Sequence, residues 1–118
     1  MDLNLALVPI PVADVDRAKA FYGERVGFVV DADHQPNDEF RIVQLTPPGS
    51  ARSIMIGERT IETGPGSVQG LQLVVSDIEA ARAELVERGL EISEWNSFAF
   101  FEDPDGNGWA WQEAPARD

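Results

Sequence analysis

The sequence predicts an α+β fold made of two tandem βαβββ modules, whose mixed sheet curves around a concave pocket with the helices on the outer face. Two observations predict this fold: the chain repeats itself once, and each copy opens with an apolar strand followed by a helix-capping aspartate. The length of 118 residues suits a single domain, 1–118, with module 1 at about 1–62 and module 2 at about 66–114.

The repeat has an offset of 63 residues, which is the separation of Asp14 and Asp77. Segment 12–20 (VADVDRAKA) aligns with segment 75–83 (VSDIEAARA), with two acidic residues over two acidic ones and Lys19 over Arg82. After one deletion, Gly27-Phe28 aligns with Gly89-Leu90. An internal repeat of this kind predicts two copies of one supersecondary unit packed together.

Each copy begins as a strand, over 3–12 and 68–75, because both segments are rich in Val, Leu and Ile. Asp14 and Asp77 are the expected helix N-caps, since their carboxylates can accept hydrogen bonds from first-turn amides. Apolar residues then recur at helical spacing, and Gly27 and Gly89 mark the expected helix ends.

Three shorter strands are expected after each helix, over 28–33, 40–46 and 53–57, and over 91–95, 97–102 and 109–112. Turns are expected at 47–50 (PPGS) and 103–106 (DPDG), and the Gly- and Pro-rich segment 63–67 should connect the modules. Neither module has much core of its own, so the two should pair and leave a concave face, where small ligands bind.

Composition excludes several classes of function. The chain has no cysteine, which excludes disulfides and Cys-ligated metals and fits a reducing, cytoplasmic compartment. The apolar run 5–12 contains two prolines and is too short to cross a membrane, so we expect no membrane association. The net charge of −12 disfavours nucleic acid and could attract a cationic ligand.

These motifs resemble the vicinal oxygen chelate superfamily, which includes glyoxalases, extradiol dioxygenases, fosfomycin-resistance transferases and bleomycin-resistance proteins. The resemblance rests on 12–22, 27–28, 75–78 and 101–107 (FEDPDGN), in an order and spacing that cover nearly the whole chain. It implies the paired-module fold and a homodimer, whose modules pair within one chain or are exchanged between two.

Metal-dependent members of that family carry His or Gln seven residues before each capping aspartate, and Glu on the last strand. The corresponding positions here are Leu7, Gly70 and Ala110, whose side chains have no lone pair to donate. We therefore expect no metal and no cofactor, which removes the basis for metal-assisted polarisation of vicinal oxygens.

Two other segments have metal-like patterns. His34 is the only histidine and lies in the polar segment 31–39, which we interpret as a solvated loop with a displaced metal site as the alternative. Asp103, Asp105 and Asn107 imitate the opening of a calcium loop, but its twelfth position is Ala114, so a turn is expected instead.

The family's ligand positions are expected to face the pocket. Residues two positions further along the same strands, Gln72 and Gln112, then face it too, while Trp109 and Trp111 point to the opposite face. Gln44 could add a polar contact and Trp95 could form the rim. The expected pocket-lining residues are Leu7, Gln44, Gly70, Gln72, Trp95, Ala110 and Gln112.

The leading hypothesis is a metal-independent binding protein of the glyoxalase/bleomycin-resistance type that sequesters a cationic or aromatic drug or metabolite. The alternative is a lyase or dioxygenase-like enzyme of the same superfamily with displaced or absent metal ligands. A third is a domain kept for partner binding or dimer formation. No nucleophile and base stand out, so the sequence assigns no catalytic residues.

Overall fold

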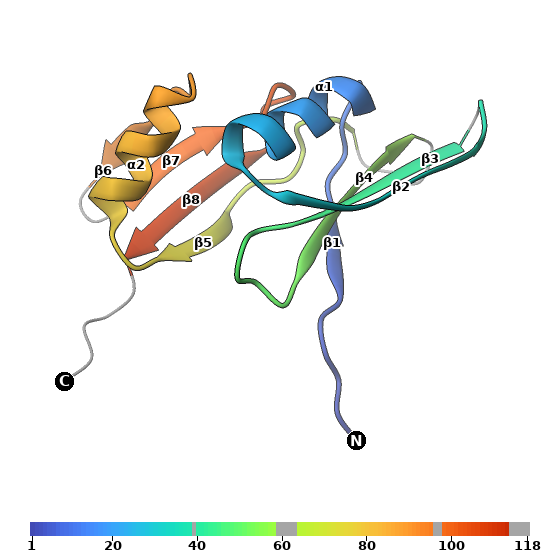
Figure 1. The fold of residues 1–118 in the computed structure, drawn as a ribbon, viewed down its shortest axis with the longest axis horizontal. Coiled ribbons are helices and arrows are strands. Elements are labelled where there is room, and N and C mark those ends of the chain that lie inside the picture. Colours follow the sequence, from blue (N-terminus) through green and yellow to red (C-terminus); the bar gives the residue numbers. More distant parts are fainter. Residues whose placement is uncertain (39, 59–63, 96–97, 114–118) are drawn as a thin grey trace.

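A computed structural model describes residues 1–38, 40–58, 64–95 and 98–113 of the chain. Two four-stranded mixed sheets lie side by side, and helix α1 lies at the junction between them (Figure 1). The molecule is flat, with principal extents of 50 × 41 × 22 Å. No helix in the described part of the chain is long and apolar enough to cross a membrane.

The first module contains β1 (Leu7–Pro9), α1 (Val15–Ala20), the π-helix η1 (Phe21–Val26), β2 (Val29–Asn37), β3 (Phe40–Thr46) and β4 (Ser53–Glu58). Its sheet has the order β1-β4-β3-β2, in which β1 is parallel to β4 and the other pairs are antiparallel.

The second module contains β5 (Leu71–Val75), α2 (Ile78–Glu87), β6 (Ser93–Trp95), β7 (Phe98–Glu102) and β8 (Gly108–Glu113). Its order, β5-β8-β7-β6, and its one parallel pair repeat the topology of the first module. The fold class is therefore the predicted one, with the strands divided into one sheet per module.

Both helices begin where the sequence predicts. The side chain of Asp14 accepts a hydrogen bond from the Arg17 amide, and that of Asp77 accepts one from the Ala80 amide, each at 3.0 Å. Gly27 and Gly89 follow the helices with φ of 90° and 94°, a left-handed conformation that favours glycine.

The predicted strand 3–12 is too long, because a strand needs a neighbour along its whole length. Strand β4 offers pairing only from Ser53, which lies opposite Leu7, so the chain before Leu7 extends beyond the sheet. Strand β5 starts only at Leu71, since Gly70 has a φ of +83° that ends extended geometry.

The polar segment expected to be a loop between two strands is also different in the structure. Strand β2 continues to Asn37, which pairs with Phe40 on β3, and the ladder contains two irregularities. Pairing with a neighbouring strand thus overrides the polar composition of this segment.

The core lies beneath α1 and joins both modules. It contains Ile10, Val15, Ala18, Tyr22, Val43, Leu45, Ile54 and Ile56 from the first module, and Leu85, Ala99, Phe101, Trp109 and Trp111 from the second. The two tryptophans are 4% and 1% exposed and belong to the core, as predicted. Trp109 also lines the cleft described below, whereas the sequence predicts that it points away from the pocket.

The two modules also meet reciprocally at their helix ends. Arg25, which follows α1, donates a 3.4 Å hydrogen bond to the Gly89 carbonyl oxygen after α2. Arg88, its counterpart in the repeat, has its guanidinium against Gly27. Each arginine therefore lies near the carbonyl end of the other module's helix, where a positive charge is favourable.

Candidate functional site

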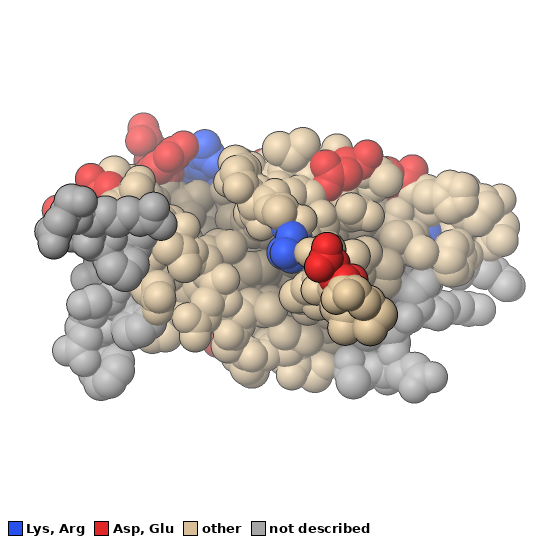
Figure 2. All heavy atoms as spheres, turned by 90° about the horizontal axis from the view of Figure 1, so that it is seen from below, with Lys and Arg blue, Asp and Glu red and all other residues tan. Residues whose placement is uncertain are grey.

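On the face of the molecule seen from below, acidic side chains gather along the upper edge, and basic and acidic side chains lie next to each other near the middle among uncharged residues (Figure 2). In the first sheet, Gln44 lies between the buried residues Val43 and Leu45 on β3 and donates a 3.3 Å hydrogen bond to the Ser53 hydroxyl. Leu7 lies opposite Ser53 in the β1–β4 register. This sheet face therefore combines apolar and neutral polar groups.

A cleft of about 1160 Å³ lies in the second module, against the helix α1 of the first. Its volume slightly exceeds the usual range for small-molecule sites. The helix side is formed by Arg17, Ala20, Phe21 and Arg25, and the other sides by Gln69, Gly70, 89–93, 100–104 and 108–110. The cleft therefore takes its walls from both modules.

Aromatic rings form much of the cleft wall. The Phe21 ring lies 6.1 Å from that of Phe101, and Phe101 stacks on Trp109 at 6.0 Å with an interplanar angle of 5°. Because the Trp109 ring is itself only 4% exposed and packed in the core, this wall is fixed in position. A rigid aromatic surface suits a ligand with flat apolar groups.

Two arginines of α1 and η1 line the same cleft as Phe21. Arg17 forms a 2.9 Å ion pair with Asp105, whose side chain is 5% exposed. Arg25 makes one hydrogen bond, to the Gly89 carbonyl, and within the described part of the chain it makes no ion pair. The cleft thus contains one cation that is already neutralised by a carboxylate and one that is not.

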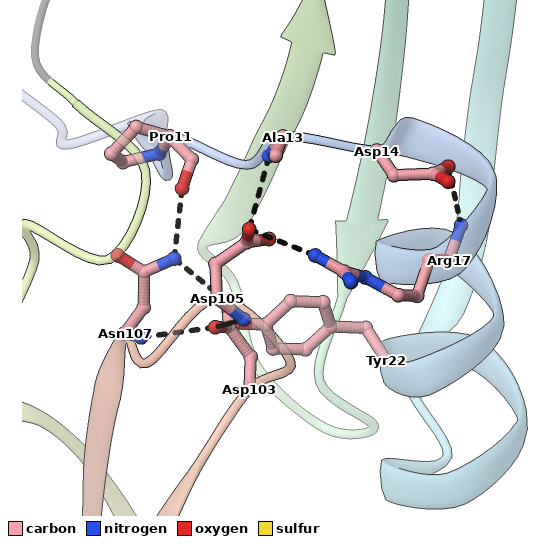
Figure 3. Close-up of polar contacts among 8 residues, drawn as sticks. All are labelled: Pro11, Ala13, Asp14, Arg17, Tyr22, Asp103, Asp105 and Asn107. Atoms are coloured by element: carbon pink, nitrogen blue, oxygen red, sulfur yellow. Dashed lines mark hydrogen bonds and ion pairs between the residues drawn. The ribbon is translucent and has the colours of Figure 1, made fainter.

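A buried polar network holds the β7–β8 turn against the first module (Figure 3). The Tyr22 hydroxyl donates to Asp103 Oδ2 at 2.7 Å and accepts from Trp109 Nε1 at 3.0 Å. Asn107 Nδ2 donates to Asp103 Oδ2 and to the Pro11 carbonyl oxygen. Burial, followed by the negative charge of Asp103, holds the pKa of Tyr22 far above its usual value, so the hydroxyl remains a proton donor.

The calcium-like segment is used as a turn, as the sequence predicts. The Gly106 amide donates to the Asp103 carbonyl at 3.0 Å, and Asp103 Oδ1 accepts from the amides of Asp105 and Asn107. Asp105 Oδ1 accepts from the Ala13 amide and from Arg17, while its buried Oδ2 has no partner among the described residues. The carboxylates of this turn bind the protein's own groups.

The expected pocket residues are divided between the two sheets. Gly70 and Ala110 line the cleft, whereas Gln72 and Gln112 lie on the second sheet outside it. Leu7 and Gln44 belong to the first sheet and do not line the cleft. The side chain of Trp95 lies outside the described residues.

The residues at the family's metal positions do not fit a metal ion. Leu7, Gly70 and Ala110 have no donor atoms in their side chains. In residues 1–38, 40–58, 64–95 and 98–113, no three or more His, Cys, Asp or Glu side chains are grouped so that they could hold one. His34 is exposed on β2, away from the cleft lining.

The cleft includes functional candidates that sequence reasoning missed. Arg17, Phe21 and Arg25 recur at four-residue spacing, which is the signal that could have identified a shared helix surface. The helical spacing of apolar residues by itself predicts that Phe21 is a core residue. The structure places it at the boundary, partly buried against the core and also lining the cleft.

Comparisons with known proteins agree with this architecture. The family model described as the Glyoxalase/Bleomycin resistance protein/Dioxygenase superfamily matches residues 4–111. YetH of Bacillus subtilis strain 168 is 27% identical over 111 residues, which cover 88% of this chain and 92% of YetH.

Solved structures are also similar. TnmS3, an antibiotic binding protein from Streptomyces sp. CB03234, has a TM-score of 0.83 and 35% identity, covering 97% of this chain and 98% of TnmS3. A glyoxalase/bleomycin resistance protein from the same Streptomyces strain has a TM-score of 0.78 and 38% identity, covering 92% of this chain and 99% of that protein.

Proposed function

The chain belongs to the glyoxalase/bleomycin resistance protein/dioxygenase superfamily, and from this premise we propose that it is a metal-independent small-molecule binding protein that sequesters a drug or metabolite. The observation that carries the proposal is the aromatic cleft beside α1, in which Gly70 and Ala110 stand where metal-dependent relatives offer donors. The similarity to an antibiotic binding protein supports the same class of function.

The ligand class that the cleft favours is aromatic. Phe21, Phe101 and Trp109 offer ring faces and edges, and the neighbouring Leu90 and Ile92 add apolar surface. Binding of this kind needs only a shaped, dry cavity.

We also propose a reducing compartment such as the cytoplasm, which the absence of cysteine supports.

A cleft-blocking variant tests the proposed site. Ala20 is an exposed residue of α1 that lines the cleft, and Ala83 is its counterpart in the repeat, exposed on α2 and outside the cleft. We expect Ala20→Trp to abolish the thermal stabilisation that wild-type protein gains from aromatic ligands, while Ala83→Trp keeps it. Screening should use neutral, cationic and anionic aromatics. Equal loss in both variants, or no stabilisation of the wild type by any compound, would contradict the proposal.

Metal independence has its own test. We expect protein purified without chelators to contain far less than one zinc, nickel, manganese or iron per chain by elemental analysis. The side chains at the three family positions offer a metal no donor, which is the reason for this expectation. A stoichiometric metal would instead favour the lyase or dioxygenase-like alternative.

We also propose that the protein is a homodimer. Met1, Leu3 and Leu5 are 108%, 84% and 62% exposed, and they alternate with the polar residues Asp2 and Asn4. An exposed apolar row of this kind is typical of an interaction surface.

A further inference from the structure

We propose that the ligand of the cleft carries an anionic group, of the carboxylate or sulfonate class, which binds the guanidinium of Arg25. The inference rests on the proposed function and adds the charge of the ligand and the residue that recognises it. It departs from the cationic ligand that the net charge of −12 would favour. The reason is one guanidinium and not the charge of the whole lining, which includes Glu91, Glu102 and Asp103 beside Arg17 and Arg25.

The first observation is that Arg25 has no carboxylate partner among the described residues of a strongly acidic protein. The chain has 21 acidic and 9 basic residues, and Arg17, Lys19, Arg41 and Arg88 form ion pairs within it. Arg17 pairs with Asp105, and Arg41 pairs with Asp33. Arg25 makes no ion pair within the described residues, although it lines a cleft.

The second observation is the number of free donors that Arg25 offers. A guanidinium has five N–H donors, and Arg25 uses one of them in a long, 3.4 Å bond to the Gly89 carbonyl. That bond holds the arginine against the segment after α2, which also lines the cleft. The remaining donors are free for a bidentate, charge-assisted bond to a planar anion.

The third observation is the position of Arg25 relative to the aromatic wall. Phe21 lies four residues earlier in the same helical segment, and Leu90 and Ile92 line the cleft beside Gly89. The cleft's carboxylates do not neutralise Arg25: Asp103 is engaged by Tyr22 and Asn107, and Glu91 and Glu102 are exposed and form no ion pair with Arg25. The site therefore suits a ligand with a flat apolar body and one anionic end.

Two fluorescent probes that differ in the anionic group test the inference. 8-Anilinonaphthalene-1-sulfonate carries a sulfonate, and N-phenyl-1-naphthylamine is nearly the same molecule without it. We expect wild-type protein to bind the sulfonate more tightly. Arg25→Gln should weaken sulfonate binding about tenfold, as expected for loss of a charged hydrogen bond, and leave binding of the neutral probe unchanged.

Arg52→Gln is the matched control, because Arg52 is exposed in the turn before β4 and lies outside the cleft, and among the described residues its side chain binds only the local Ala51 carbonyl. It should leave both affinities unchanged. Arg25→Lys, which keeps the charge but not the planar fork, should lose about threefold for the sulfonate alone. This second variant keeps the test valid if Arg25→Gln fails to fold, as thermal unfolding would reveal.

An equal loss of affinity for both probes in the Arg25 variants would overturn the inference, because Arg25 would then shape the cleft without recognising the anionic group. Equal loss of sulfonate binding in the Arg25 and Arg52 variants would overturn it as well, since the effect would be long-range attraction. If neither probe binds the wild-type protein, the proposed function itself fails. Binding of both probes with unchanged affinities in the Arg25 variants overturns only the role of Arg25.

Discussion

At the scale of single residues, the motif that most resembles a metal loop acts as a fastener between modules. Asp103 accepts hydrogen bonds from Tyr22, Asn107 and the turn's own amides, and Asn107 reaches back to the Pro11 carbonyl. Asn107 is fully buried and Asp103 is 5% exposed, so water cannot hydrogen-bond to these side chains. The bonds within the protein satisfy their polar atoms instead. The turn thereby fixes one end of the cleft.

A pH-dependent prediction concerns Asp33. Hydrogen bonds from Arg41 and then from Lys19 hold the pKa of Asp33 well below its ordinary value of 3.8. A lowered folded-state pKa means that this stabilisation is complete above the unfolded-state pKa and is lost as the pH falls through the folded-state pKa.

We expect Asp33→Asn to destabilise the protein by about 1 kcal/mol at pH 7, the upper end for partly exposed ion pairs. The difference from wild type should shrink as the pH falls below 3.8, where the unfolded chain begins to take up the proton. Thermal unfolding of both proteins across a range of pH measures this difference in stability. Asp2→Asn, which removes one charge from the exposed N-terminal segment, is the control. A difference that stays constant down to acidic pH would contradict the assignment.

At the scale of elements, the repeat explains both what the modules share and where they differ. Both helices start at an aspartate cap, and a left-handed glycine follows each helical segment, Gly27 after η1 and Gly89 after α2. The arginines near these ends, Arg25 and Arg88, contact the opposite module. Only the first helix continues as a π-helix, Phe21–Val26. Such wider turns are frequent at functional sites, and this one carries two residues of the cleft, Phe21 and Arg25.

Three glycine variants test whether the segment that connects the modules packs tightly against the β7–β8 turn. Gly64 has open space around it, Gly49 has open space but a φ of +81°, and Gly66 has a φ of +81° and lies against the Asp105 carbonyl oxygen. We expect Gly64→Ala to be nearly neutral, Gly49→Ala to cost about 1 kcal/mol from backbone strain, and Gly66→Ala about 3 kcal/mol from strain and overlap. Denaturant unfolding measures all three. Equal costs at positions 49 and 66 would show that the connection does not dock tightly.

At the scale of the whole molecule, two similar sheets share one core, and the cleft takes its walls from both modules. Helix α1 lies at the junction of the two sheets (Figure 1) and packs on its own sheet. Its continuation, η1, places Phe21 and Tyr22 against Phe101 and Trp109 of the second sheet. A ligand in the cleft would touch both modules, so its binding should stabilise their relative position.

The proposed homodimer predicts a measurable change of mass. We expect the wild-type protein to sediment as a dimer and the double variant Leu3→Glu/Leu5→Glu as a monomer, because charges on the exposed apolar row oppose burial. Val86→Glu places the same charge on an exposed apolar residue of α2 and should remain dimeric. A wild-type monomer at every concentration, checked by native mass spectrometry, would contradict the proposal.

The sequence alone determined the repeated modules, the two aspartate caps, the helix-ending glycines and the burial of Trp109 and Trp111, because these depend on neighbours within a few residues. Only the tertiary structure decided the length of β1, the extension of β2 to Asn37 and the composition of the cleft. Tyr22 and Asp103 are separated by 81 residues, and Arg25 and Gly89 by 64. Periodicity records which side of an element is buried, but not which distant segment will pack there, so contacts of this kind arise only when the chain folds.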